Sequence, residues 1–166
     1  MKHELFLESQ KLVLFRSYQH FCQLEKVLKF FDKDIISRLE LSIIGKFPKD
    51  SYENINEFEQ DVFNIESKWK KLLDNSVDFG YFENSEIGLV YVVGPLTSIF
   101  LYKINEAPLG VISAGPYGIL RGLGAEEKQT RAYFRLLNNG SDLLILRGEG
   151  NDLFDAENFM DSPHSQ

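Results

Sequence analysis

The sequence has few of the residues that build covalent frameworks or metal sites. Its 166 residues include one cysteine, Cys22, so an intramolecular disulfide is excluded and a reducing compartment is favoured. The three histidines, His3, His20 and His164, do not form a metal-binding spacing, so we expect no metal and no cofactor. Because Cys22 lies inside a predicted helix without a neighbouring activating group, we interpret it as a small core residue.

Positive charge and long apolar runs are also scarce. Lysine and arginine total 18 against 25 acidic residues, and the net charge of −7 argues against a nucleic-acid partner, since a phosphate backbone requires a basic surface. The uncharged runs 87–102 and 107–120 are shorter than the roughly 20 residues that span a bilayer. A buried helical hairpin is therefore predicted, with an interfacial membrane contact as the alternative. Residues 1–11 contain no apolar signal-peptide core, so we expect a cytoplasmic protein.

Motifs that carry catalysis are missing as well. There is no G-x-S-x-G elbow. The glycine-rich run at 118–124, GILRGLG, lacks the Lys-Ser/Thr of a phosphate-binding loop, and Glu127 stands where a dinucleotide fingerprint requires glycine. We therefore assign no catalytic residue and no enzymatic activity.

What the sequence does contain is the pattern of an α+β domain. Apolar or alternating runs predict strands near 11–16, 38–46, 87–93 and 142–147. Apolar residues at spacings of three and four predict helices near 18–34, 55–74 and 125–138, the first and the last of them on one face of the sheet. We expect one domain at 1–150 with an insert at about 49–121, then an acidic, flexible tail at 151–166. The predicted core includes Leu14, Phe21, Leu28, Ile43, Trp69, Tyr133 and Leu144.

Glycine and proline mark the turns around the insert. Gly94 and Pro95 form a breaker pair after the third predicted strand, where proline suits the first turn of a new helix. Gly122 and Gly124 allow a tight turn before the last helix, and Gly140 fits the left-handed position after its end. Between these turns we expect two apolar helical segments, at 96–104 and 110–121.

Mainly over residues 87–147, the chain resembles a family of bacterial general-stress-type, glycine-rich domains of unknown function, in the segments GPLTSIF (94–100) and GVISAGPYGILRGLGAEEKQTRAYFRLLNNGSDLLILRG (110–148). The residues that match are a leucine-glycine turn, an acidic helix start, an aromatic and the glycine after the helix: Leu123, Gly124, Glu126, Glu127, Tyr133 and Gly140. The resemblance implies a ferredoxin-like split βαβ sandwich with an inserted helical segment. It implies a stress-associated role and no catalytic residues.

Positive side chains gather around the last predicted helix at Arg121, Arg131 and Arg135. Arg131 and Arg135 lie one helical turn apart, a spacing at which two guanidinium groups can hold one anion. The alternative is a solvated face paired with Glu127. A pocket between the sheet and the insert would make the protein a small-ligand-sensing or anion-sensing regulatory domain.

Two strands carry apolar residues at consecutive positions, LVLF at 12–15 and LLIL at 143–146. A strand that is wet on one face alternates instead, so the second face of this sheet needs a cover. Either the chain's own residues 95–120 or a second copy of the protein can provide it. We therefore predict a non-enzymatic interaction domain that forms a homodimer, with the ligand-sensing domain as the alternative function.

Overall fold

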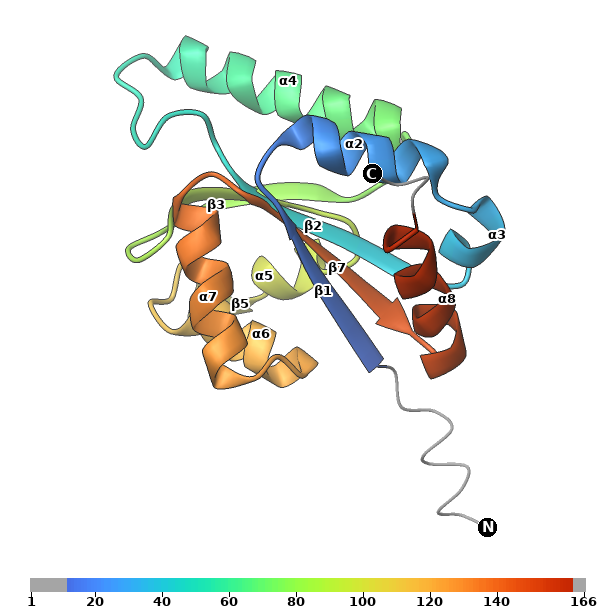
Figure 1. Ribbon diagram of the computed structural model, residues 1–166. Helices are drawn as coiled ribbons and strands as arrows, with labels where there is room; N and C mark the ends of the chain where they lie inside the picture. The colour runs from blue at the N-terminus through green and yellow to red at the C-terminus, as the bar shows by residue number, and fades with distance from the viewer. Residues whose placement is uncertain (1–11, 163–166) are drawn as a thin grey trace.

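The computed structural model describes residues 12–162, which form an α+β fold around a five-stranded antiparallel sheet (Figure 1). The strands lie in the order β1-β7-β2-β4-β3. Their bounds are Leu12–Tyr18 for β1, Glu40–Lys46 for β2, Phe79–Asn84 for β3, Gly88–Val93 for β4 and Asp142–Gly148 for β7. A separate two-stranded hairpin pairs β5 (Lys103–Ile104) with β6 (Ala107–Pro108). The predicted strands 11–16, 38–46, 87–93 and 142–147 correspond to β1, β2, β4 and β7.

Helices cover both faces of the sheet. The first layer contains α2 (Phe21–Phe30), α3 (Lys33–Ile36), α4 (Ile55–Leu72) and α8 (Gly150–Met160). The second layer contains α5 (Thr97–Phe100), α6 (Gly115–Leu123) and α7 (Glu127–Asn138). Figure 1 shows α2 and α4 above the sheet and α5, α6 and α7 below it.

The central strands are buried on both faces, as their consecutive apolar residues predict. In β7, Leu144 and Leu146 face the first helical layer, whereas Leu143 and Ile145 face the second. The neighbouring strands β2 and β4 alternate in the same way, because successive side chains of a strand point to opposite faces. The chain's own helices fill both sides, so the sheet does not need a second molecule to cover it.

Gly94 directs the chain from β4 into the second layer. Its φ is +96°, and a Cβ atom there would lie 2.3 Å from the carbonyl oxygen of Leu41, so the position requires glycine. The hydroxyl of Ser42 then accepts a hydrogen bond from the backbone N–H of Leu96 at 3.1 Å. Gly94 is thus the turn that the sequence predicts, and Pro95 precedes α5 by two residues.

The other predicted turn glycines have different outcomes. Gly124 and Gly140 have φ values of +121° and +91°, at the turns before and after α7. Gly140 and Ser141 donate backbone hydrogen bonds to Leu137 and Leu136, which satisfies carbonyl groups at the end of α7. Gly122 is a correction, because it lies inside α6 and not in the turn.

The segment at 150–160 is helical, where the sequence predicts a flexible tail at 151–166; residues 163–166 lie outside the described part of the chain. Leu153, Ala156 and Met160 of α8 are buried against the first face, at spacings of three and four. Asp152 of α8 accepts a hydrogen bond from Nε of Arg38 at 2.8 Å. The prediction was wrong because acidic residues between the apolar positions obscure the helical stripe.

Residues 77–86, where the sequence analysis places no strand, contain the edge strand β3. Gly80, Phe82 and Asn84 are buried while Tyr81 and Glu83 are exposed, the alternation of a strand with one wet face. The predicted helix 96–104 is also shorter than expected, because α5 ends at residue 100 and the β5–β6 hairpin follows. The predicted helix 110–121 is α6, shifted to residues 115–123.

The two helices predicted to share one face, α2 and α7, lie on opposite faces. Leu24 and Val27 of α2 pack in the first layer, whereas Leu137 of α7 packs in the second. The reason is the long connection from β4 to β7, which runs beneath the sheet and buries Leu96 and Phe100 there, so that α7 follows on the same side.

The predicted core is confirmed at its centre. Ile43, Trp69 and Leu144 are fully buried. The remaining predicted residues are half-buried, namely Leu14, Phe21, Leu28 and Tyr133. Cys22 is a correction, since its side chain is exposed on α2.

Candidate functional site

A buried polar row crosses the centre of the sheet. The hydroxyl of Tyr91 on β4 donates a hydrogen bond to Oδ1 of Asp142 on β7 at 3.1 Å, across the intervening strand β2. Gly45 of β2 pairs with Tyr91, and a Cβ atom at Gly45 would lie 2.4 Å from the tyrosine oxygen and 2.6 Å from the carboxylate. The aromatic ring reaches Asp142 only because Gly45 has no side chain.

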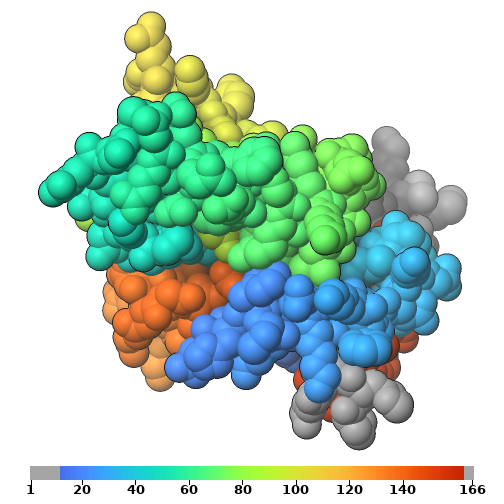
Figure 2. Space-filling view, turned by 90° about the horizontal axis from the view of Figure 1, so that it is seen from above, coloured from blue at the N-terminus to red at the C-terminus, as the bar shows by residue number. Residues whose placement is uncertain are grey.

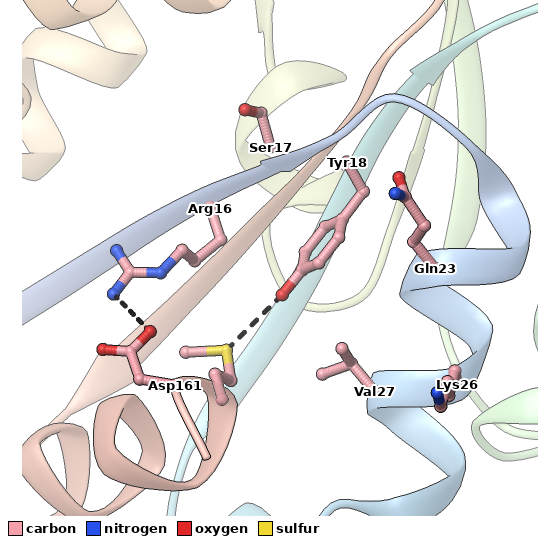
Figure 3. Close-up of a pocket in the computed structure, with 8 residues that line it drawn as sticks. Arg16, Ser17, Tyr18, Gln23, Lys26, Val27 and Asp161 are labelled. Carbon is pink, nitrogen blue, oxygen red and sulfur yellow. Dashed lines mark hydrogen bonds and ion pairs between the residues drawn. The ribbon is translucent and has the colours of Figure 1, made fainter. Parts of the chain in front are cut away.

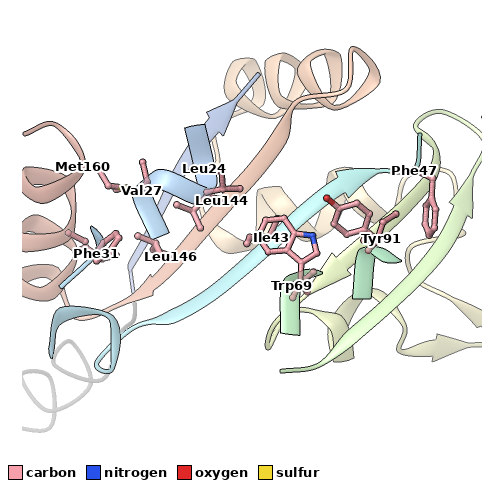
Figure 4. Close-up of a cluster of buried hydrophobic side chains, with 14 residues drawn as sticks. Leu24, Val27, Phe31, Ile43, Phe47, Trp69, Tyr91, Leu144, Leu146 and Met160 are labelled. Carbon is pink, nitrogen blue, oxygen red and sulfur yellow. The ribbon is translucent and has the colours of Figure 1, made fainter. Parts of the chain in front are cut away.

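Helix α4 closes this row from the first layer. Trp69 is fully buried, and its indole nitrogen faces the hydroxyl of Tyr91 without closing a hydrogen bond to any described residue (Figure 4). The ammonium of Lys68 lies 3.9 Å from the ring centroid of Phe21, a cation–π contact, and its charge acts on Asp142.

The polar row is electrostatically perturbed. Burial raises the pKa of Asp142, while the hydrogen bond from Tyr91 and the charge of Lys68 lower it in part. Burial and the charge of Asp142 raise the pKa of Tyr91 well above its ordinary range, so the phenol stays a donor. Perturbed groups often mark active sites. Here, however, Tyr91 is 3% and Asp142 9% exposed, which leaves no room for a substrate, and the row is best interpreted as structural.

The sequence-predicted arginines Arg131 and Arg135 line one surface hollow of about 380 Å³ between α6 and α7. Its walls include Tyr117 of α6 and Phe134 of α7, whose ring centroids are 6.1 Å apart. Asn138 and the turn between β3 and β4, at 86–87, complete the rim. We call this site the α6–α7 hollow.

The charged side chains around the α6–α7 hollow differ in whether they have an ion-pair or hydrogen-bond partner. Arg131 pairs with Glu127 at 2.6 Å, one turn earlier on the same exposed face. The guanidinium of Arg135 has no ion pair or hydrogen bond within residues 12–162. Glu86 on the opposite rim accepts a hydrogen bond from the hydroxyl of Ser113 at 3.0 Å. Arg135 therefore supplies the unpaired positive charge, and an exposed ion pair is weak enough for Arg131 to exchange its partner.

The third predicted arginine, Arg121, does not line this hollow. Its guanidinium donates a hydrogen bond to the carbonyl oxygen of Ala125 at 3.0 Å and so helps to close the turn between α6 and α7. Of the three predicted arginines, Arg131 and Arg135 therefore line the same hollow, whereas Arg121 binds the backbone of the nearby turn.

A second hollow, of about 440 Å³, lies between the end of β1, α2 and α8 (Figure 3). Its polar groups already bind one another. Arg16 forms ion pairs with Glu157 at 3.4 Å and with Asp161 at 3.7 Å, and the hydroxyl of Tyr18 donates to the sulfur of Met160 at 3.7 Å. These contacts attach α8 to the sheet, so this hollow is a weaker candidate for a ligand.

Two further classes of site find no support in the described part of the chain. Residues 12–162 contain no group of three or more histidine, cysteine or acidic side chains placed to hold a metal ion. None of the helices among these residues has the length and apolar character needed to cross a membrane.

No family model, curated protein or solved structure matches this chain.

The raised pKa of Asp142 predicts a pH-dependent loss of stability. The folded state holds this proton more tightly than the unfolded chain, whose aspartate titrates at about pH 4. Raising the pH from about 4 through the raised folded pKa should therefore lower the free energy of unfolding of the wild type relative to Asp142→Asn, which keeps an acceptor for Tyr91. Urea titrations over a pH series measure this difference.

Asp155→Asn, which removes an exposed carboxylate on α8, is the matched control and should give the same pH profile as the wild type. The interpretation is wrong if the profile of Asp142→Asn also parallels that of the wild type.

Proposed function

We propose that the protein is a regulatory binding domain that takes a small organic anion in the α6–α7 hollow. The observation that carries this proposal is the position of Arg131 and Arg135, one helical turn apart on the same hollow, with Arg135 unpaired among the described residues. This function is the ligand-sensing alternative from the sequence analysis, and no catalytic group is needed for it.

The walls of the hollow indicate the kind of anion. A guanidinium group presents a planar set of donors that fits a carboxylate or a phosphate. Tyr117 and Phe134 offer aromatic surface beside it, which suits a planar or apolar body. Glu86 on the far rim disfavours a second negative charge at that end. The best fit is an aromatic carboxylate or a phosphate ester with a ring.

Isothermal titration with benzoate, inorganic phosphate and a nucleoside monophosphate tests this proposal. We expect saturable binding of at least one ring-bearing anion. Arg135→Gln should weaken that binding by about tenfold or more, because a charge-assisted hydrogen bond is lost. Arg131→Gln should have a smaller effect, since Arg131 must first leave Glu127.

Lys128→Gln is the matched control, because Lys128 is an exposed cation of the same helix that does not line the hollow. It should leave the affinity unchanged. Absence of binding for all three anions, or equal affinity in the wild type and Arg135→Gln, would contradict the proposal.

Self-association through the insert is a second proposal, and a separate observation supports it. Large apolar side chains are exposed along 102–112: Tyr102 (63%), Ile104 (45%), Val111 (41%) and Ile112 (37%). Part of this segment, coloured yellow, projects from the edge of the molecule (Figure 2). Exposed apolar side chains of one segment are typical of a protein contact. Because the chain covers both sheet faces itself, the insert is the part that we propose for the dimer interface.

The proposed dimer predicts a dimeric mass at micromolar concentration in light scattering. The double variant Ile104→Asp, Val111→Asp should give a monomer, because two charges would be buried unpaired in the contact. Phe63→Asp, at a still more exposed apolar site on α4, should stay dimeric. A monomeric wild type across the micromolar range would rule out the dimer.

We further propose that the chain is related to the general-stress-type family and to the ferredoxin-like split βαβ sandwich. One support is the split βαβ arrangement itself: β1 and β2 run parallel to each other, and β7 lies between them. The other support is the positive φ of Gly124 and Gly140 at the turns that match the family pattern. The stress-associated role and the cytoplasmic location stay predictions.

A further inference from the structure

The first helical layer leaves part of the sheet uncovered, at an apolar opening. A hollow of about 430 Å³ lies between the end of α2, α3, the start of β2 and the end of α4. Eight of its twelve lining residues are apolar, and most of these side chains, among them Leu28, Ile36, Leu41 and Leu72, are only half-buried. We call this site the α2–α4 hollow.

The opening has a structural cause. Helix α3 is a single turn of four residues, and it packs mainly against α8. Helix α4 ends at Leu72, and its last apolar residues form the opposite wall. The start of β2 therefore stays partly uncovered, and apolar side chains from all four elements face a space of ligand size.

Charge at the rim of the α2–α4 hollow is divided between its two sides. Lys29 and Lys33 stand on the side of α2 and α3, and Asp74 stands on the side of α4. Lys29 pairs with Glu25 at 3.7 Å, whereas the ammonium of Lys33 has no partner within residues 12–162. The backbone N–H of Ser76 donates to Asp74 at 3.0 Å and lowers the pKa of that carboxyl group.

We propose that the α2–α4 hollow binds a medium-chain carboxylic acid. The alkyl chain lies along Leu28, Ile36, Leu41 and Leu72, where it removes half-exposed apolar surface from water. The carboxylate binds the ammonium of Lys33, which gives a partner to an unpaired cation on a protein of net charge −7. Asp74 disfavours the opposite orientation of the ligand, because it would bring two carboxylates together.

The alkyl chain of the ligand and its carboxylate charge should each contribute to the affinity. Each additional buried methylene contributes about 0.8 kcal/mol in general, so affinity should rise roughly fourfold per carbon from hexanoate through octanoate to decanoate. Decan-1-ol, which has the same chain without the charge, should bind at least about fivefold more weakly than decanoate at neutral pH.

Isothermal titration on the full chain, with decanoate below its aggregation concentration, is the test. Lys33→Gln should weaken decanoate binding by about fivefold or more and leave decan-1-ol binding unchanged. Lys71→Gln, which removes an exposed charge of α4 that does not line the hollow, is the control and should change neither. Both lysines are exposed, so these variants leave the core intact.

Several outcomes would overturn the proposal. They are the absence of saturable decanoate binding, an affinity that does not depend on chain length, and equal binding of decanoate to the wild type and to Lys33→Gln. Loss of binding in the double variant Arg131→Gln, Arg135→Gln would place the ligand in the α6–α7 hollow instead. Binding of anionic phospholipid vesicles but not of free decanoate would identify a membrane surface as the partner, which would also overturn it.

Discussion

The packing of the sheet against the first helical layer depends on the missing side chain at Gly45. The space above this glycine lets the Tyr91 ring cross β2, so that its hydroxyl donates a hydrogen bond to Asp142 on the next strand. Trp69 then seals the pair from above. A buried carboxylate is costly unless it is hydrogen-bonded, so the three positions depend on one another. This row joins β7, β2 and β4, the three strands at the centre of the sheet.

Helices of the chain cover both faces of the sheet, and the two candidate ligand sites lie where these helices meet or end. The α6–α7 hollow lies where the insert meets the last helix of the second layer, and it combines aromatic walls with an unpaired arginine. The α2–α4 hollow lies where the ends of α2 and α4 and the short helix α3 leave the start of β2 partly uncovered, and it combines apolar walls with an unpaired lysine. Both sites present positive charge on an acidic protein, and for both we propose an anion that carries an apolar part.

Local patterns in the sequence predicted local features well. The consecutive apolar residues of β7 correctly indicated burial on two faces, and the four-residue spacing correctly placed Arg131 and Arg135 side by side. Features that depend on distant pairing were missed. Asp142, Tyr91 and Gly45 meet only through the strand order, and nothing in the sequence near any one of them shows that order. The α2–α4 hollow could not be predicted either, since a gap between helices depends on where each helix ends in space.

The most direct test of the account is the free energy of unfolding of Gly45→Ala, measured by chemical denaturation beside Gly118→Ala. An added Cβ at Gly118, on the surface of α6, meets no atom within 4 Å, so alanine there should stabilise the protein by about 0.5–1 kcal/mol. At Gly45 the same methyl group would displace the Tyr91 hydroxyl from Asp142, and we expect a loss of at least about 2 kcal/mol. If Gly45→Ala were neutral or stabilising, as for an ordinary glycine in a strand, Tyr91 and Asp142 would not depend on the open space at Gly45, and the account would be contradicted.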